Sequence, residues 1–181
     1  SLLRAIDKKK LSKKVNVFDK SKEAQSFIKN NLPGKVFNDI NESVKDSDLI
    51  IISTPLSSYK EILLSIKSGL KKNVILTDTG STKKEVNKVI SNLNLKDVFW
   101  IASHPIAGTE YSGPESGFSE LFENRWCILS GEDQQQKETL EILKKFWEKI
   151  GSKVKFMTFE EHDHVLSLTS HLPHAIAYSI V

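Results

Sequence analysis

Cysteine is almost absent: Cys127 is the only one among 181 residues. This excludes a disulfide framework within the chain and a metal site built from several cysteines. Long hydrophobic runs are also lacking, because stretches such as residues 49–52 are strand-sized and far short of the roughly 20 residues that span a bilayer. No signal-peptide pattern is visible. We therefore expect a cytoplasmic protein with no membrane partner.

Arginine is scarce, with Arg4 and Arg125 the only two. Lysine and arginine together number 26 against 23 acidic residues, so the net charge is +3, and the lysines are interspersed with acids. Proteins that read nucleic acids favour clustered basic residues and the guanidinium fork of arginine. The composition thus indicates a solvated lysine-rich surface, and we expect no nucleic-acid partner.

None of the eight glycines forms a G-x-G-x-x-G motif. The rest of the pattern nevertheless alternates short β-branched runs with amphipathic stretches, which predicts a Rossmann-like doubly wound α/β fold with a mainly parallel sheet. A first strand and its glycine-rich turn would precede residue 1, where the sequence already reads as helix. Strands are expected at 15–18, 49–53, 73–77, 98–102, 126–130 and 153–157, and helices at 21–29, 58–66, 82–93 and 135–150.

The last segment has a different character. Thr158 and Glu161 form a T-x-x-E capping box that opens a long helix towards Val181, and Pro173 should kink that helix or interrupt its hydrogen bonds. We therefore predict a dinucleotide-binding domain over residues 1–157. Residues 158–181 would be the first helix of a helical substrate and dimerisation domain. On this interpretation the chain is truncated at both ends.

Polar residues follow several predicted strands, at the edge where this architecture binds cofactors. Asp19 ends the strand 15–18, where an acid accepts hydrogen bonds from the adenine ribose, although it could equally be a turn or cap acid for the next helix. Ser53-Thr54-Pro55 follows the strand 49–53 and could be a cofactor contact or only a helix cap. Gly80 and Ser81, in Thr77-Asp78-Thr79-Gly80-Ser81, end the next strand in the same way.

The strongest signal is the segment from Ser103 to Gly113, which combines His104, Glu110, small residues and glycines after a strand. A glycine-rich polar loop at this edge supplies close backbone approach together with a titratable group. A second cluster places four histidines between residues 162 and 174. Four histidines on one helix suggest a zinc site, but no cysteine lies near them and their spacing matches no zinc-protease pattern, so we expect no metal.

Two motifs together resemble the paired signature of the prephenate/arogenate dehydrogenase family. They are His104-Pro105-Ile106-Ala107-Gly108-Thr109-Glu110 and Ser170-His171-Leu172-Pro173-His174. Thr77-Asp78-Thr79-Gly80-Ser81 and the strand before Asp19 resemble the family at the same relative places. The resemblance covers essentially the whole chain.

The resemblance implies oxidative decarboxylation of prephenate to 4-hydroxyphenylpyruvate in tyrosine biosynthesis, with hydride transfer to NAD⁺. His104 would accept a hydrogen bond or proton from the substrate's ring hydroxyl, and Ser81 would orient His104. Thr109 and Glu110 would shape the substrate pocket, which His171 and His174 would close.

Cofactor contacts would come from Asp19, Ser53, Thr54, Pro55 and Gly80. A carboxylate at position 19 repels a 2′-phosphate, so NAD is expected over NADP. The complete protein would be a homodimer acting on a small-molecule substrate. Without the glycine-rich turn and the rest of the helical domain, the chain by itself is expected to be inactive and poorly stable.

Three alternatives stay open. Arogenate could replace prephenate as substrate. The chain could belong to a hydroxy-acid or imino-acid dehydrogenase of two domains, although such enzymes give no reason to expect both histidine motifs. It could also be a non-catalytic nucleotide-sensing module with the same fold, which would keep Asp19 but would not need His104.

Overall fold

The computed structural model describes residues 1–131 and 137–180, without the side chains of His171 and His174. The helices are α1 (Leu2–Lys8), α2 (Lys22–Asn31), α3 (Ile40–Val44), α4 (Tyr59–Ile66), α5 (Lys84–Leu93), α6 (Lys137–Ile150), α7 (Phe159–Leu166) and α8 (Leu172–Ile180), with 3₁₀ turns η1 (Leu56–Ser58) and η2 (Lys67–Gly69) and a π-helical turn η4 (Ser167–His171). The strands are β1 (Asn16–Val17), β2 (Lys35–Val36), β3 (Leu49–Ile52), β4 (Val74–Asp78), β5 (Val98–Trp100), β6 (Ala102–Pro105), β7 (Trp126–Ser130) and β8 (Lys153–Phe156).

Strand β4 is the centre of a parallel sheet ordered β3–β4–β5. All five of its residues are buried, which explains why its sequence is apolar without alternation until Thr77 and Asp78. Helices α4 and α5 cover this sheet with one apolar cluster that includes Tyr59, Leu63 and Ile90. The register places Ile52 beside Asp78, so the carboxyl ends of β3 and β4 stand together.

The prediction of a single strand over 98–102 is wrong, because two strands meet there. β5 ends at Trp100 and β6 begins at Ala102. The amide of Ile101 between them donates to the carbonyl of Leu76, so the chain continues alongside β4 while it changes partners. Strand β6 then pairs antiparallel with β7, and β7 pairs parallel with β8.

A second apolar cluster fills the space between the β6–β7–β8 sheet and helix α6. Trp147 of α6 is fully buried there, with its ring edge-on to Phe122 and Phe146. Ala5 and Ile6 of α1 join the same cluster. The N-terminal helix is therefore part of this core, although the short pair β1–β2 forms a separate parallel ladder.

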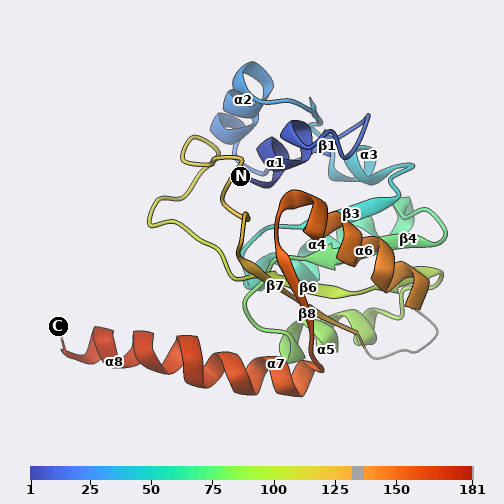
Figure 1. The fold of residues 1–181 in the computed structure, drawn as a ribbon. Helices are drawn as coiled ribbons and strands as arrows, with labels where there is room; N and C mark the ends of the chain where they lie inside the picture. The colour runs from blue at the N-terminus through green and yellow to red at the C-terminus, as the bar shows by residue number, and fades with distance from the viewer. Residues whose placement is uncertain (132–136, 181) are drawn as a thin grey trace.

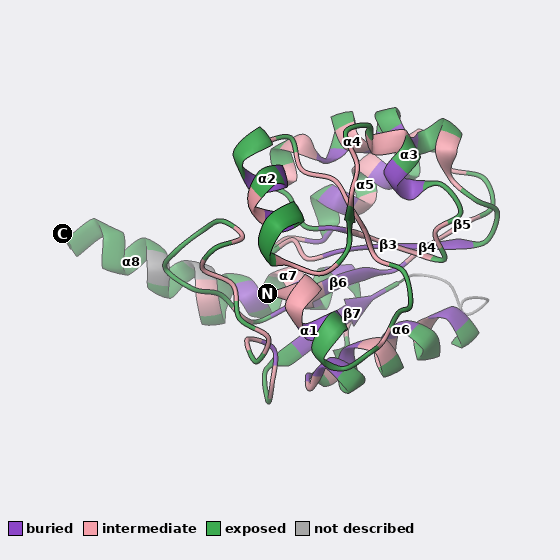
Figure 2. Ribbon diagram, turned by 90° about the horizontal axis from the view of Figure 1, so that it is seen from above, coloured by how far each residue is buried: buried purple, intermediate pink, exposed green. Residues whose placement is uncertain are grey.

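Helix α7 packs against α5 and β7, and α8 extends away from the body of the molecule (Figure 1). The capping box is present as predicted: Thr158 Oγ1 accepts from the Glu161 amide at 3.1 Å, and Glu161 Oε2 accepts from the Thr158 amide at 2.8 Å. The interruption expected at Pro173 takes the form of the π-helical turn immediately before α8. Figure 2 shows the described part of α8 exposed, and Leu168, Leu172 and Ile176 are half or more exposed.

The predicted Rossmann-like α/β fold with a mainly parallel sheet is confirmed, and the predicted helices over 21–29, 58–66 and 82–93 correspond to α2, α4 and α5. The start of the helix predicted from residue 135 lies outside the described residues, and α6 begins at Lys137. Strand β2 and helix α3 were not predicted. The division at residues 157 and 158 stays a prediction. None of the helices described is long and apolar enough to cross a membrane.

Candidate active site

The end of β4 and the neighbouring β6 are joined by polar side chains inside the protein. Thr77 Oγ1 and Ser103 Oγ share a hydrogen bond of 2.5 Å, and both residues are fully buried. Ser103 Oγ also lies 2.8 Å from the carbonyl of Asp78, and its amide donates to Asp78 Oδ1 at 3.1 Å. These bonds fix the backbone of β6 one residue before His104.

Lys83 extends the same network from the turn between β4 and α5. Its ammonium donates to Asp78 Oδ1 at 2.9 Å, to Asp78 Oδ2 at 2.7 Å and to the carbonyl of Ser103 at 2.8 Å. Both side chains of this ion pair are completely buried. Burial raises the pKa of Asp78 and lowers that of Lys83, while their mutual attraction opposes both shifts. The three donors of the ammonium are thus all used to hold β4, its turn and β6 together.

Helix α7 adds two residues above this network. His162 is fully buried, and its Nε2 lies 2.9 Å from Nδ1 of His104. On the other side of the ring, His162 Nδ1 lies 2.7 Å from Asp163 Oδ1. The two imidazoles are tilted by 55° with centroids 5.1 Å apart. Three side chains from β6 and α7 therefore form one continuous hydrogen-bonded chain.

The electrostatics of α7 favour a neutral ring beside a charged carboxylate. Burial lowers the pKa of His162, and the bond to Asp163 opposes that shift. Burial alone would raise the pKa of Asp163, but hydrogen bonds from the Lys84 amide, the His162 ring and the Lys83 amide lower it overall. Near neutral pH, His162 is therefore uncharged and Asp163 is ionised.

The structure places His104 in strand β6, opposite Ile128, and not in a loop as predicted. The prediction was wrong because the proline and glycines after His104 suggested irregular backbone, whereas β7 supplies a partner strand up to Pro105. The side chain is half-buried. Gly80 and the exposed Ser81 lie in the turn after β4, whose last residue, Asp78, accepts from the amide of Ser103 next to His104. The contact between Ser81 and His104 stays a prediction.

The predicted cofactor residues occupy the ends of parallel strands. Asp19 follows β1 and is half-buried, and its Oδ1 accepts from the amide of Ser21 at 2.9 Å. The cap of α2 is Ser21 itself, so Asp19 makes the turn before the helix. Ser53, Thr54 and Pro55 are exposed directly after β3. Both the turn role and a cofactor role are compatible with these positions.

The four predicted substrate residues fall into two groups. Thr109 and Glu110 are exposed in the segment 106–125 between β6 and β7, where Thr109 Oγ1 donates to the Tyr111 carbonyl at 2.7 Å. His171 and His174 lie on η4 and α8, and their side chains are outside the described structure. Among the side chains that are described, no group of three or more His, Cys, Asp or Glu is arranged to hold a metal ion.

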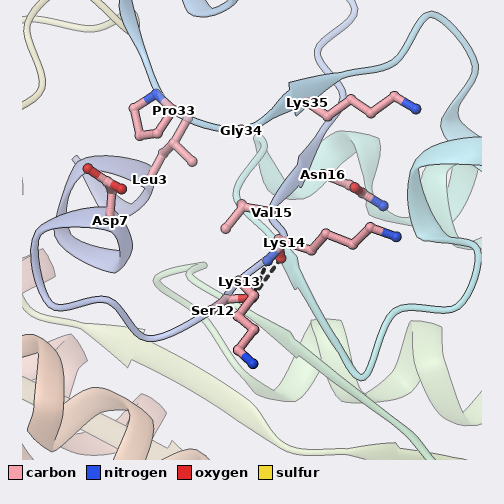
Figure 3. A pocket seen from close by; sticks show the side chains of 10 residues that line it. All are labelled: Leu3, Asp7, Ser12, Lys13, Lys14, Val15, Asn16, Pro33, Gly34 and Lys35. Atoms are coloured by element: carbon pink, nitrogen blue, oxygen red, sulfur yellow. Dashed lines mark hydrogen bonds between the residues drawn. The ribbon is translucent and has the colours of Figure 1, made fainter.

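A pocket of about 230 Å³ lies away from these residues, at the beginnings of β1 and β2 (Figure 3). Residues of α1, of the segment 12–16 and of the segment 33–35 line it, and Lys13, Lys14 and Lys35 stand at its margin. It lies at the amino ends of the strands, whereas this architecture binds cofactors at the carboxyl ends. We therefore assign it no part in the candidate site.

Sequence reasoning missed three members of the site: Lys83, His162 and Asp163. His162 and Asp163 were visible in the histidine cluster, but the helical spacing of His164, Ser167 and the later histidines drew attention to the opposite face. The burial of Phe159 and Leu166 shows which face points inward, and His162 lies on it. An apolar residue three or four positions on either side of a histidine was the usable signal.

Residues 2–156 match the family model described as the nucleotide-binding domain of prephenate dehydrogenase. The chain belongs to the prephenate dehydrogenase family. Among curated relatives, it is 38% identical over 168 residues to the cyclohexadienyl dehydrogenase of Zymomonas mobilis, covering 92% of this chain. The chain spans 57% of the length of that relative.

Solved structures of prephenate dehydrogenase agree with this family assignment. The crystal structure of the enzyme from Aquifex aeolicus superposes with a TM-score of 0.89 at 29% identity, covering 99% of this chain and 65% of that one. A complex of the A. aeolicus enzyme with hydroxyphenyl propionate and NAD⁺ gives a TM-score of 0.88 at 27% identity, covering 99% and 63%. His104, Lys83 and Asp78 lie within the residues that match this family's nucleotide-binding domain, whereas His162 and Asp163 follow them.

Proposed function

We propose that the protein carrying this chain oxidises and decarboxylates prephenate to 4-hydroxyphenylpyruvate, with NAD⁺ as hydride acceptor. The observation that supports this proposal most directly is the position of His104. A half-buried imidazole stands near the carboxyl end of β6, held through its Nδ1, in a chain whose family is prephenate dehydrogenase. An imidazole is a suitable acceptor for a hydroxyl proton near neutral pH.

The chemistry assigns roles to the remaining residues. His104 accepts the hydrogen bond of the ring hydroxyl and takes its proton as the C–O bond gains double-bond character. Hydride leaves the same carbon, the ring carboxylate departs as carbon dioxide, and the ring becomes aromatic as its oxygen takes the proton back from His104. Ser81 orients His104, Thr109 and Glu110 shape the pocket, and His171 and His174 close it. When bound, the nicotinamide supplies only the hydride acceptor, and the protein supplies placement.

The residues at the strand ends fit a dinucleotide. Asp19 presents a half-buried carboxylate two residues after the end of the parallel strand β1, which suits the hydroxyls of a ribose. The same negative charge disfavours a ribose 2′-phosphate, so NAD is proposed over NADP. Ser53, Thr54, Pro55 and Gly80 provide exposed or half-buried backbone at the ends of β3 and β4 for the rest of the cofactor.

Arogenate is the second candidate substrate. It shares the cyclohexadienyl ring with prephenate, and the Zymomonas relative is named for that ring. A non-catalytic nucleotide sensor is the alternative from another class. It would bind NAD⁺ through the strand ends, but His104 would have no role in it.

The test is NAD⁺ reduction by the full natural protein, offered prephenate and arogenate separately. Activity with one or both identifies the substrate. His104→Asn should abolish turnover while NAD⁺ binding is retained, whereas His164→Asn, on the exposed face of α7, should leave turnover unchanged. If NAD⁺ binds and neither compound is oxidised, the sensor is favoured and the proposed function is wrong.

A further inference from the structure

The hydrogen-bonded chain Asp163–His162–His104 restricts which ring nitrogens of the two histidines are protonated. Its links are 2.7 Å between Asp163 Oδ1 and His162 Nδ1, and 2.9 Å between His162 Nε2 and His104 Nδ1. Each link joins two atoms, one of which must carry the hydrogen. Because a neutral imidazole has one N–H and one bare nitrogen, fixing one end of the chain fixes all of it.

The fixed end is Asp163. An ionised carboxylate can only accept, and its two oxygens also receive the amides of Lys83 and Lys84 at 2.9 and 3.0 Å. These amides open helix α5, so Asp163 of α7 caps the N-terminus of another helix. The carboxylate is therefore held in one orientation, and His162 Nδ1 must be the donor to it.

The second condition is that His162 carries a single proton. Its ring is fully buried, and burial disfavours the charged form. The charged groups that act on it are Asp163, Asp78 and the ammonium of Lys83, and the last two neutralise each other as an ion pair. A neutral His162 that donates through Nδ1 has a lone pair on Nε2. That nitrogen must accept, and His104 Nδ1 must donate to it.

We propose that His162 and Asp163 are positioning residues that hold His104 in its Nδ1–H tautomer. The lone pair is thereby kept on Nε2, the nitrogen that would accept the substrate's hydroxyl proton. This inference rests on the proposed function for its catalytic consequence, but not for the tautomer itself. It gives α7 a part in orienting His104, in addition to the role predicted for Ser81. Neither residue of α7 needs to touch substrate or cofactor.

The variants His162→Phe and His162→Gln separate this role from a purely structural one. Phenylalanine keeps the ring volume in the buried site but offers no acceptor to His104. Glutamine packs less well, but its amide oxygen reaches the position of Nε2 and can accept from His104 Nδ1. A proton acceptor contributes about 10²–10⁴-fold to a rate, so we expect His162→Phe to lower kcat about 100-fold with little change in KM. His162→Gln should recover to within about 10-fold of the natural protein.

His164→Phe is the matched control, because it makes the same substitution on the exposed face of the same helix and should not change kcat. A glutamine variant no more active than the phenylalanine variant would show that ring packing alone matters, and would overturn the proposal. Circular dichroism and unfolding midpoints establish that each variant is folded.

A second measurement needs neither activity nor a variant at position 162. Nitrogen-15 spectra of histidine rings in the full natural protein report the tautomer directly, and His104→Gln identifies the His104 signals by their loss. A neutral Nδ1–H ring supports the proposal, and an Nε2–H ring overturns it. If the Nδ1–H tautomer is found but neither prephenate nor arogenate is oxidised, the positioning stands and the proposed function falls.

Discussion

The buried ion pair of Lys83 and Asp78 gives the sharpest stability prediction. The substitution Lys83→Met keeps most of the side-chain volume and removes the ammonium. The three hydrogen bonds from Nζ, to both oxygens of Asp78 and to the carbonyl of Ser103, disappear together. Asp78 is then left as a buried carboxylate without its counter-ion.

The size of the loss follows from what remains. Asp78 still accepts from the amides of Gly80 at 3.0 Å and Ser103 at 3.1 Å, and from the hydroxyl of Tyr59 at 3.2 Å. Neutral donors compensate a buried charge only in part. Removing one partner of a buried ion pair typically costs about 3–5 kcal/mol, and we expect Lys83→Met to lower the free energy of unfolding by that amount.

The assay is urea-induced unfolding of the full natural protein at pH 7, followed by tryptophan fluorescence. Lys88→Met is the matched control, because Lys88 pairs with Glu85 on the solvent-exposed face of α5. That substitution should change the free energy of unfolding by about 0.5 kcal/mol or less.

The double variant Lys83→Met with Asp78→Asn tests the cause. Replacing both charges removes the unpaired carboxylate, so the double variant should be more stable than Lys83→Met alone. A cost for Lys83→Met no larger than that of Lys88→Met would refute the reasoning. Costs that simply add in the double variant would refute it as well, because they would show that the two side chains do not interact.

Three further predictions concern the surroundings of the site. Gly80→Ala should cost about 1–3 kcal/mol in unfolding free energy, because a Cβ would lie 2.6 Å from Leu56 Cδ2 and 2.8 Å from Asp78 Oδ2. Gly131→Ala is the control, because a Cβ there would have no atom within 4 Å. Equal unfolding midpoints for the two variants would contradict the packing argument. Thr158→Ala removes the cap of α7 and should cost about 1 kcal/mol. Its control is Ser65→Ala, at an exposed position of α4, which should change the free energy of unfolding by about 0.5 kcal/mol or less. An unchanged midpoint for Thr158→Ala would show that the cap does not hold α7. Burial lowers the pKa of His162 below its ordinary 6.5, so the unfolded chain binds its proton first as the pH falls. The stabilisation by neutral His162 is complete above pH 6.5 and is lost as the pH drops towards the lower pKa of the folded state. Over that range, the free energy of unfolding of the natural protein should therefore fall more than that of His162→Gln. Parallel curves of stability against pH for the two proteins would contradict this.

The sequence by itself determined the fold class and the strand ends at which we propose the candidate site. Buried parallel strands leave an unbroken apolar signature, as in β3 and in the first residues of β4, and polar residues begin where such strands end. Asp19, Gly80 and His104 could therefore be singled out from local pattern. The capping box at Thr158 and the interruption before Pro173 were equally local, because each depends on residues within one helical turn.

Only the tertiary structure decided which side chains meet His104. The partner strand β7 and the helix α7 lie more than 20 and more than 50 residues further along the chain, so no local spacing could show that His104 extends a strand or that His162 contacts it. The local sequence around Lys83 indicates a solvated lysine in a turn, and only the position of β6, whose Ser103 carbonyl accepts from its ammonium, shows that it is buried. Burial shifts the pKa of His162, and it makes the buried carboxylate of Asp78 depend on Lys83 for a counter-ion. Burial arises only when the layers of the fold assemble, so no single segment of the sequence reveals it.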